Sequence, residues 1–519
     1  MLAAQLLMTS LQAEALTADE RAFLADYPIG GICLFAHNIR DRYQAAELCA
    51  ELRACCGEQL LIATDQEGGG VVRALDVPYP PSAMALGAAA DLPLSYAVAQ
   101  ATARGLRALG INVDFAPVAD VNNNPANPVI ADRAFGADPQ AVAAQVVAFV
   151  QGLQAEGVAA TLKHFPGHGD TQIDSHVALP ELPWGRERLE HCEFVPFRAG
   201  IAAGAAAVMS FHGLLPQLDP DAPATMSSAV MHGLLREHLG FDGVIFSDAL
   251  NMQAIAARYS PAQAYQRCLA AGVDMPVYVR ALPSDPASPD TRQGLQALET
   301  MLQHCQAAID AGDLDATALQ HSHQRLQRLA RRYPASSNPE QAWRVGDEAL
   351  LARAAQQAIV AYGTFPNLAA GSRLCVIAAE RVVANAASDM RNIPVHSLVD
   401  KLRAAGFVCD FLSYGREQPN IAALQAQLPL DSTSSLLFVS SSRLRMAAAE
   451  KAWLQHIIQH SQQHGQQLLH IALWNPYHVA DVDAPALISF GFRPASLEAI
   501  VQVLQGNAQP SAQSPISLK

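Results

Sequence analysis

Short apolar runs alternate with helical patterns along the first half of this chain. The segments 43–55 and 139–156 carry apolar residues at helical spacing, as expected for helices that lie between strands. Alternation of this kind predicts a parallel sheet, and eight strands are the number that closes a (β/α)8 barrel. The eight runs that predict strands are 5–8, 31–35, 60–64, 112–116, 159–162, 206–209, 244–247 and 273–277.

The second half repeats the alternation with fewer strands. Apolar runs at 374–378, 407–412, 436–440, 468–473 and 487–490 are separated by helical patterns such as 396–405 and 447–464. They predict an open sheet with helices on both faces. With 519 residues the chain is too long for one ordinary core. We therefore expect a (β/α)8 barrel at 1–335, a helical linker at 336–372 that includes a helix near 347–362, and an αβα domain at 373–519.

Composition and charge exclude several classes of function. Half of the residues are hydrophobic and 16% are charged, which is typical of a well-buried α/β enzyme. The net charge of −14 argues against nucleic acid or an anionic membrane as a partner. No apolar run is long enough to span a bilayer, and the first residues do not resemble a signal peptide. The 9 cysteines lack framework spacing, so we expect reduced thiols and a cytoplasmic protein.

Polar residues gather at the ends of the predicted strands. In a barrel the carboxyl ends of all strands face one mouth, where active sites are built. The sequence therefore predicts a pocket at that mouth. The residues at or just after strand ends are Asp65, Gln66, Glu67, Asp114, Lys163, His164, Ser210, His212 and Asp248.

The stretch KHFPGHGDTQIDSH, residues 163–176, holds the densest polar chemistry. Asp174 precedes His176 by two residues, so its carboxylate is able to turn back and hydrogen-bond the imidazole. Such a contact fixes the tautomer of the ring and raises its basicity. The histidines could instead bind a metal, although no cysteine or carboxylate shows metal-site spacing beside them. The glycines could form only a turn, and the phosphate-loop pattern GxxxxGK[ST] is absent.

The same stretch resembles the signature K-H-F-P-G-H-G-x-T-x-x-D-S-H of the β-N-acetylglucosaminidase branch of glycoside hydrolase family 3. The resemblance implies a two-domain member in which His176, held by Asp174, is the catalytic acid and base. Usual retaining glycosidases pair two carboxylates instead. An imidazole has a reference pKa of about 6.5, so it suits both proton transfers. It also carries no negative charge and so does not repel an incoming anion. For this reason phosphate could replace water as the acceptor, and the sequence leaves that choice open.

Asp248 lies in FDGVIFSDALNM, at the end of the seventh predicted strand. From its position alone, an aspartate that caps the next helix is an equally good interpretation. The string resembles the family's nucleophile segment, which implies that Asp248 attacks the anomeric carbon of the sugar.

Further segments resemble the family's sugar-binding positions. Asp65 and Arg73, in LIATDQEGGGVVR, and Arg133, in FAPVADVNNNPANPVIADRAFG, are implied as ligands of sugar hydroxyls. Gly70 stands where the family usually has an arginine, so one guanidinium is missing near the mouth. The remaining implied contacts come from Lys163, His164 and, as an apolar wall, Met209. His168 and His212 are interpreted equally well as substrate contacts or as braces of their loops.

The second domain resembles the C-terminal domain of two-domain members through LWNPYHVADVDAPALISFGFRPASLEAIVQVLQG. We expect no catalytic residue from it. A glycine-rich fingerprint is absent after its first strand, so no cofactor is expected.

Together with these patterns, the resemblance implies an exo-acting retaining β-N-acetylglucosaminidase. It also implies GlcNAc-containing cell-wall fragments as the substrate, in peptidoglycan recycling. A β-glucosidase or a GlcNAc phosphorylase on the same scaffold is the alternative enzyme. A catalytically silent sugar-binding protein is the alternative outside catalysis, and the set Asp174, His176 and Asp248 argues against it. The sequence leaves the aglycone and the oligomeric state open.

Overall fold

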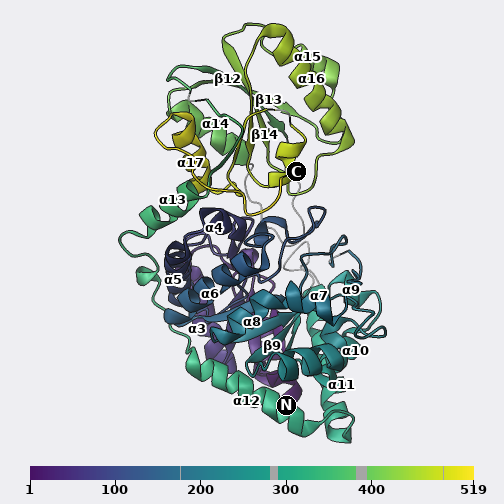
Figure 1. Cartoon of the computed structure of the whole chain (residues 1–519). Coiled ribbons are helices and arrows are strands. Elements are labelled where there is room, and N and C mark those ends of the chain that lie inside the picture. The colour runs from purple at the N-terminus through teal and green to yellow at the C-terminus, as the bar shows by residue number, and fades with distance from the viewer. Residues whose placement is uncertain (176, 281–289, 367, 381–393, 483, 519) are drawn as a thin grey trace.

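A computed structural model describes residues 1–175, 177–280, 290–366, 368–380, 394–482 and 484–518. Two bodies are stacked along the chain (Figure 1): a barrel that begins at the N-terminus, and a smaller sheet domain above it. The marked C-terminus lies near the junction of the two bodies. In the described part of the chain no helix is long and apolar enough to cross a membrane.

The first body is a closed barrel of parallel strands in the order β1-β10-β9-β8-β7-β6-β3-β2, which confirms the predicted barrel. The first strand was predicted wrongly at 5–8, because residues 2–5 form the short helix α1 (Leu2–Gln5) and the strand begins only at Met8. The strands are β1 (Met8–Ser10), β2 (Gly31–Leu34), β3 (Leu61–Thr64), β6 (Val113–Asp114), β7 (Ala159–Phe165), β8 (Ala207–Ser210), β9 (Val244–Ala249) and β10 (Met275–Tyr278).

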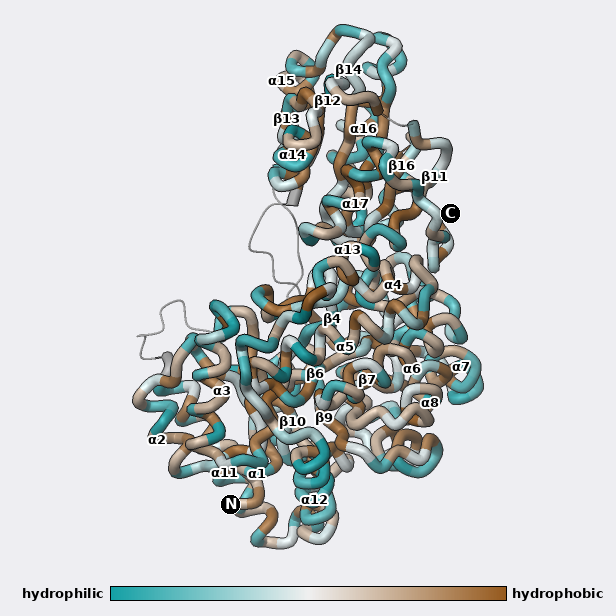
Figure 2. The backbone as a smooth tube through the Cα atoms, turned by 90° about the vertical axis from the view of Figure 1, so that its left-hand side faces the viewer, coloured by the Kyte–Doolittle hydropathy of each residue, from teal (hydrophilic) through white to brown (hydrophobic). Residues whose placement is uncertain are grey.

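Helices surround the barrel, and their N-termini are capped by residues that the sequence supplies. Asp41 accepts hydrogen bonds from the backbone N–H groups of Tyr43 and Gln44, both at 2.9 Å, and so begins α3. Figure 2 shows α12 largely teal on the outside of the barrel, as expected for a helix with one solvated face. The helices are α2 (Ala18–Asp26), α3 (Arg42–Cys56), α4 (Ala83–Ala89), α5 (Leu92–Ala108), α6 (Pro139–Ala155), α7 (Arg186–His191), α8 (Phe194–Ala202), η4 (Ala229–His238), α9 (Gln253–Ala256), α10 (Pro261–Ala271), α11 (Asp290–Ala311) and α12 (Ala316–Arg332).

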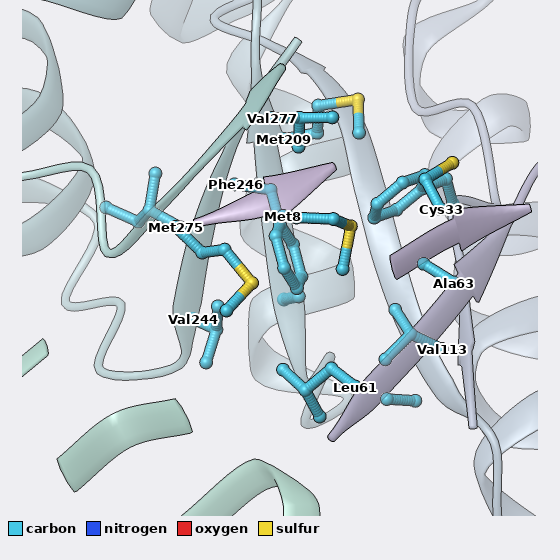
Figure 3. Packing of buried hydrophobic residues seen from close by; sticks show 14 of the residues in the cluster. Met8, Cys33, Leu61, Ala63, Val113, Met209, Val244, Phe246, Met275 and Val277 are labelled. Carbon is cyan, nitrogen blue, oxygen red and sulfur yellow. The ribbon is translucent and has the colours of Figure 1, made fainter. Parts of the chain in front are cut away.

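The barrel interior is filled by apolar side chains from its strands (Figure 3). Met8, Leu61, Val244 and Met275 are fully or almost fully buried there. The ring of Phe246 meets that of Phe115 edge to face, with 5.3 Å between centroids. This packed interior closes the barrel below its mouth.

The second body is a six-stranded sheet in the order β11-β16-β15-β14-β12-β13. Its five parallel strands confirm the predicted runs, and β11 joins the edge antiparallel to β16. The predicted helix at 347–362 is too long: α13 (Asp347–Gln357) ends five residues earlier, and β11 follows within the segment expected to be a helical linker. The strands are β11 (Val360–Tyr362), β12 (Arg373–Ala379), β13 (Val408–Tyr414), β14 (Ser434–Ser440), β15 (Leu468–Ala472) and β16 (Ala486–Ile488).

Helices cover both faces of this sheet, as predicted. One face packs against α14 and α17, and the other packs against α15 and α16. An apolar cluster joins α4 of the barrel to β11 and β16 of the second sheet. The helices are α14 (Pro394–Ala404), α15 (Ile421–Gln425), α16 (Ala448–His464) and α17 (Pro494–Leu504).

Candidate active site

A pocket opens at the carboxyl ends of the barrel strands. The predicted site residues other than Asp174 and His176 line it: Asp65, Arg73, Arg133, Lys163, His164, Met209 and Asp248. The structure thus brings together side chains that are up to 183 positions apart, from Asp65 to Asp248.

Two strands place their polar residues inside the barrel mouth rather than after it. Strand β7 continues to Phe165, beyond the predicted end at residue 162, so Lys163 and His164 belong to the strand itself. Strand β9 likewise continues to Ala249 and contains Asp248. Side chains held by hydrogen-bonded strands keep a fixed direction, which suits a site that must hold its groups in place.

Lys163 and Glu67 form the centre of a buried ion-pair network. The Lys163 ammonium lies 2.7 Å from Asp65 Oδ1 and 2.5 Å from Glu67 Oε1. Arg133 binds Glu67 through two parallel contacts, Nε to Oε2 and Nη2 to Oε1, both at 2.7 Å. Arg73 lies 3.6 Å from Asp65 Oδ2 and has its guanidinium over the ring of Phe35. The bidentate geometry holds Arg133 in one orientation toward the pocket.

This network determines the charge of its members. Burial alone would raise the pKa of Glu67, but Arg133 and Lys163 outweigh burial and hold that pKa well below the usual value. Burial opposes ionisation of Lys163 as well, and Asp65 and Glu67 overcome it and raise the pKa of the ammonium. Glu67 is therefore a carboxylate, and Lys163 an ammonium, throughout the neutral range.

His164 is oriented by an aspartate that the sequence did not nominate. Its Nδ1 lies 2.7 Å from Asp120 Oδ2, and its Nε2 lies 3.3 Å from Arg133 Nη2. Since Arg133 can only donate, Nε2 accepts and Nδ1–H donates to Asp120. Burial disfavours the charged carboxylate, but His164 and His168 outweigh it and lower the pKa of Asp120. The imidazole therefore presents a fixed edge to the pocket.

Asp248 is half-buried, and its strand end is tied to its neighbours. Its Oδ1 accepts from the Ala249 backbone N–H at 2.7 Å. The Ser247 hydroxyl accepts from Val277 N–H at 2.8 Å and so fixes β9 to β10. His212 is fully buried, with Nε2 3.0 Å from the Ala249 carbonyl oxygen. His212 is absent from the residues that line this pocket, and its contact with Ala249 braces the strand end.

The loop that follows β7 folds back over the mouth. His168 is buried and contacts the hydroxyls of Thr171 at 2.8 Å and Ser175 at 3.2 Å. Burial lowers the pKa of His168 to about 3, so the ring is neutral. Ser175 lines the pocket, and its carbonyl accepts from Ala254 N–H at 3.2 Å.

Of the predicted pair Asp174 and His176, the structure describes Asp174. Asp174 is half-buried, and its carbonyl oxygen accepts from Val177 N–H at 2.9 Å. His176 lies outside the described residues. Ser175 and Asp248 line the same pocket.

Gly70 lies in the turn of the hairpin formed by β4 (Gln66–Gly68) and β5 (Val71–Val72). Strand β4 carries Glu67, and Arg73 directly follows β5. Arg493, from the second domain, donates from Nε to the Gly69 carbonyl at 2.8 Å. A guanidinium therefore does reach the hairpin beside Gly70, although it comes from a distant part of the sequence.

An eight-stranded parallel barrel with carboxylates, an ammonium and guanidinium groups around one mouth is the architecture of an enzyme for a polar small molecule. The profile "Glycosyl hydrolase family 3 N terminal domain" matches residues 3–329. The chain belongs to glycoside hydrolase family 3.

Relatives support this assignment along the whole chain. The "Beta-hexosaminidase" of Pseudomonas aeruginosa is 40% identical over 275 residues, which is 52% of this chain and 80% of that protein. The "Beta-hexosaminidase A" of Pseudoalteromonas piscicida is 35% identical over 60% of this chain, and the match spans 55% of its length. A family 3 β-N-acetylglucosaminidase from Paenibacillus sp. has a TM-score of 0.88 at 30% identity and covers 100% of this chain and 98% of its own.

Proposed function

We propose that this chain is an exo-acting, retaining β-N-acetylglucosaminidase. The observation that carries the proposal is the single pocket in which Asp248 lies with Lys163, His164 and Arg133. Similarity to proteins named β-hexosaminidase, and to a β-N-acetylglucosaminidase over its full length, supports GlcNAc as the sugar. So does a solved relative from Neisseria gonorrhoeae in complex with N-trifluoroacetyl-D-glucosamine, which is 30% identical and covers 68% of this chain and 98% of its own, with a TM-score of 0.57.

Asp248 is the nucleophile in this proposal. Its carboxylate attacks the anomeric carbon, and the bond to the leaving oxygen breaks as that oxygen takes a proton from the acid. Water then loses a proton to the same group and displaces Asp248, which restores the configuration of the sugar. The fixed position of β9 favours attack from one direction, because both of its flanks are hydrogen-bonded near Asp248.

His176 is the acid and base, held by Asp174. Three carboxyl groups near the mouth are poor alternatives. Glu67 and Asp120 have lowered pKa values, so neither holds a proton to donate at neutral pH. Burial raises the pKa of Asp114 to about 7, but Asp114 is fully buried and does not line the pocket. A group from the loop after β7 is a better proton donor than these three.

The polar wall of the pocket suits a terminal sugar ring. Asp65 and Glu67 offer acceptors, and Arg73, Arg133 and Lys163 offer donors, within one enclosed volume. Met209 is an apolar surface on the barrel side, against which a ring face packs. We propose hydroxyl recognition by Asp65, Arg73, Arg133, Lys163 and His164.

We further propose that the natural substrate is a GlcNAc-containing cell-wall fragment, processed in the cytoplasm. The nine cysteines, all free thiols in the structure, support a reducing compartment. The acceptor in the second step is water in this proposal.

The decisive experiment compares nitrophenyl β-glycosides of GlcNAc, glucose and xylose, each with and without phosphate. We expect the highest kcat/KM for the GlcNAc glycoside, no dependence on phosphate, and a β-configured first product by NMR. Preference for the glucoside, or a sugar phosphate as product, would contradict the proposal.

A further inference from the structure

One arginine of the second domain reaches the catalytic barrel. Arg443 follows β14 and is only 3% exposed. Its Nη2 donates to the carbonyl oxygens of Val129 and, at 2.9 Å, Ile130. The same nitrogen lies 3.6 Å from Asp132 Oδ1. These contacts cross more than 300 positions of sequence and join the two bodies at the pocket rim.

The segment that Arg443 holds also carries Arg133. Val129 lines the pocket, and its carbonyl oxygen accepts from Arg133 Nη1 at 3.3 Å as well as from Arg443. One oxygen thus joins the two guanidinium groups. If the Val129 carbonyl shifts, it alters the hydrogen bond that it accepts from Arg133, the residue that binds Glu67.

The backbone is strained between Ile130, which Arg443 binds, and Arg133. Ala131 has φ of +42°, in the left-handed region that side chains with a Cβ rarely adopt. Such a conformation persists when surrounding contacts fix it. The hydrogen bonds of Arg443 are to the two carbonyls directly before Ala131, so they restrain the turn where it is strained.

Arg443 is itself held in place within the second domain. Its carbonyl oxygen accepts from Asn475 Nδ2 at 2.7 Å, and its guanidinium lies 6.0 Å from the centre of the Trp474 ring. Burial lowers the pKa of Arg443 to about 10 despite the nearby carboxylates Asp132, Glu67 and Asp174, and the group stays charged at neutral pH. A buried cation of this kind needs its partners, so the contact resists rearrangement.

We propose that Arg443 is a positioning residue of the sugar site: it holds the Val129–Ile130 carbonyls and the strained turn at Ala131, and so sets the position of Arg133. The second domain then contributes to the geometry of the pocket, because Arg443 belongs to it. This inference rests on the proposed function, in which Arg133 binds the sugar.

The test compares Arg443→Met with the wild type in the full-length protein. The measurements are kcat and KM for whichever nitrophenyl glycoside the wild type turns over best, and the inhibition constant of the free sugar released from it. We expect both kcat/KM and sugar affinity to fall about tenfold, since a small displacement of one positioning group has effects of that size. Arg443→Lys, which retains a donor for one carbonyl, should lose less.

Rescue separates positioning from general stability. Ala131→Gly removes the Cβ that makes the turn strained, so in the Arg443→Met background it should restore sugar affinity by about fivefold. In the wild-type background it should change affinity by less than about twofold. A matched control is Tyr477→Phe, which deletes another contact between the domains, from Asn122 Nδ2 to the Tyr477 hydroxyl at 3.0 Å. It should lower the melting temperature without changing sugar affinity.

Two results would overturn the inference: wild-type sugar affinity in Arg443→Met, or a loss that Ala131→Gly does not relieve and Tyr477→Phe reproduces. If Arg443→Met does not fold, Arg443→Lys with and without Ala131→Gly gives the same comparison. Failure of the proposed function has a different outcome, because it is seen in the wild type as absence of activity on GlcNAc glycosides.

Discussion

At the residue scale, the acidic side chains near the barrel mouth differ in the partners that each one has. Glu67 lies between two cations, Asp120 pairs with His164, and Asp114 accepts only the Gln66 backbone N–H, at 3.0 Å, among the hydrogen bonds of the described residues. These surroundings separate their pKa values, in the way that assigns acids and bases within one site. Asp248 lines the same pocket, and its Oδ1 accepts from the Ala249 backbone N–H.

Asp248→Asn tests the nucleophile. The amide has nearly the same shape but does not form a glycosyl ester, so kcat should fall by about 10⁴-fold or more while the sugar's inhibition constant stays within about threefold. Asp221→Asn, at an exposed aspartate, is the control and should leave both constants unchanged. Substantial turnover by a folded Asp248→Asn protein would refute the assignment.

His176→Ala tests the acid and base through the leaving group. A dinitrophenyl glycoside needs little protonation, so its glycosylation step should remain fast while hydrolysis of the intermediate stalls. Azide needs no base and should rescue that stalled step with formation of a glycosyl azide, detected by mass spectrometry. Asp174→Ala should have a milder effect, because the ring remains and only its orientation and basicity change.

Equal losses for good and poor leaving groups, without azide rescue, would exclude His176 as the acid and base. Because Glu67 and Asp120 have lowered pKa values, that result would require a different carboxylate at the mouth.

Asp114 supplies a pH-dependent prediction. Burial raises its pKa to about 7, so between the ordinary value of 3.8 and about 7 the folded protein holds a proton that the unfolded chain loses. Its contribution to stability is therefore greatest below pH 3.8 and is lost as pH rises to about 7. Asp114→Asn keeps the acceptor for Gln66 N–H and should stabilise the protein by roughly 2–4 kcal/mol at pH 8, but hardly at pH 4.

Chemical denaturation at several pH values measures this difference, with the exposed Asp26→Asn as control. A gain that does not depend on pH would contradict a raised pKa at Asp114.

At the scale of elements, the strands and helices that the sequence predicted are those with a clear periodicity of apolar residues. The barrel strands and the five parallel strands of the second sheet are apolar runs with helices between them, and the structure confirms their number and order. Strand β11 was missed because Val360–Tyr362 continues an apolar pattern that also fits a helix. Strand β7 was predicted too short because Lys163 and His164 look like a strand end, whereas ion pairs and Asp120 allow them inside the barrel.

The hairpin that carries Glu67 gives a prediction at this scale. Gly68 has φ of +104°, and an added Cβ would lie 2.1 Å from the Pro81 carbonyl oxygen. Gly68→Ala should therefore displace the hairpin, separate Glu67 from Lys163 and Arg133, and lower kcat/KM at least about tenfold. Gly204→Ala has a similar φ of +87° but meets nothing within 4 Å. It should cost only about 1–2 kcal/mol of stability and leave kcat/KM unchanged.

Steady-state kinetics and thermal melting of the two variants distinguish steric displacement from backbone strain alone. Equal effects of both substitutions on kcat/KM would show that the close approach of Gly68 to Pro81 does not matter.

At the scale of the whole molecule, residues that follow the carboxyl ends of three strands of the second sheet contact the barrel. Arg443 follows β14, Tyr477 follows β15, and Phe490 follows β16, where its carbonyl oxygen accepts from the Ser82 hydroxyl at 2.6 Å. None of these contacts has a local signature, because each joins residues more than 300 positions apart. For this reason the sequence nominated no site residue from the second domain. Glu67 was predicted only as one of several polar residues at strand ends, and Asp120 appeared only within a longer motif.

The polar tail after α17 also joins the two bodies and gives the last prediction. The Pro515 carbonyl accepts from Ala137 N–H at 3.0 Å, and Ile516 is buried in the cluster that holds Met84 of α4 and Ile488 of β16. Ile516→Ala should cost about 2–4 kcal/mol, because it leaves a cavity between the domains. Thermal melting should show a lower midpoint, whereas Val345→Ala, at a fully exposed valine, should not change it. Because the tail packs beside the segment that follows Arg133, we expect sugar affinity to weaken only as the melting transition is approached. An unchanged midpoint for Ile516→Ala would mean that the tail does not hold the domains together.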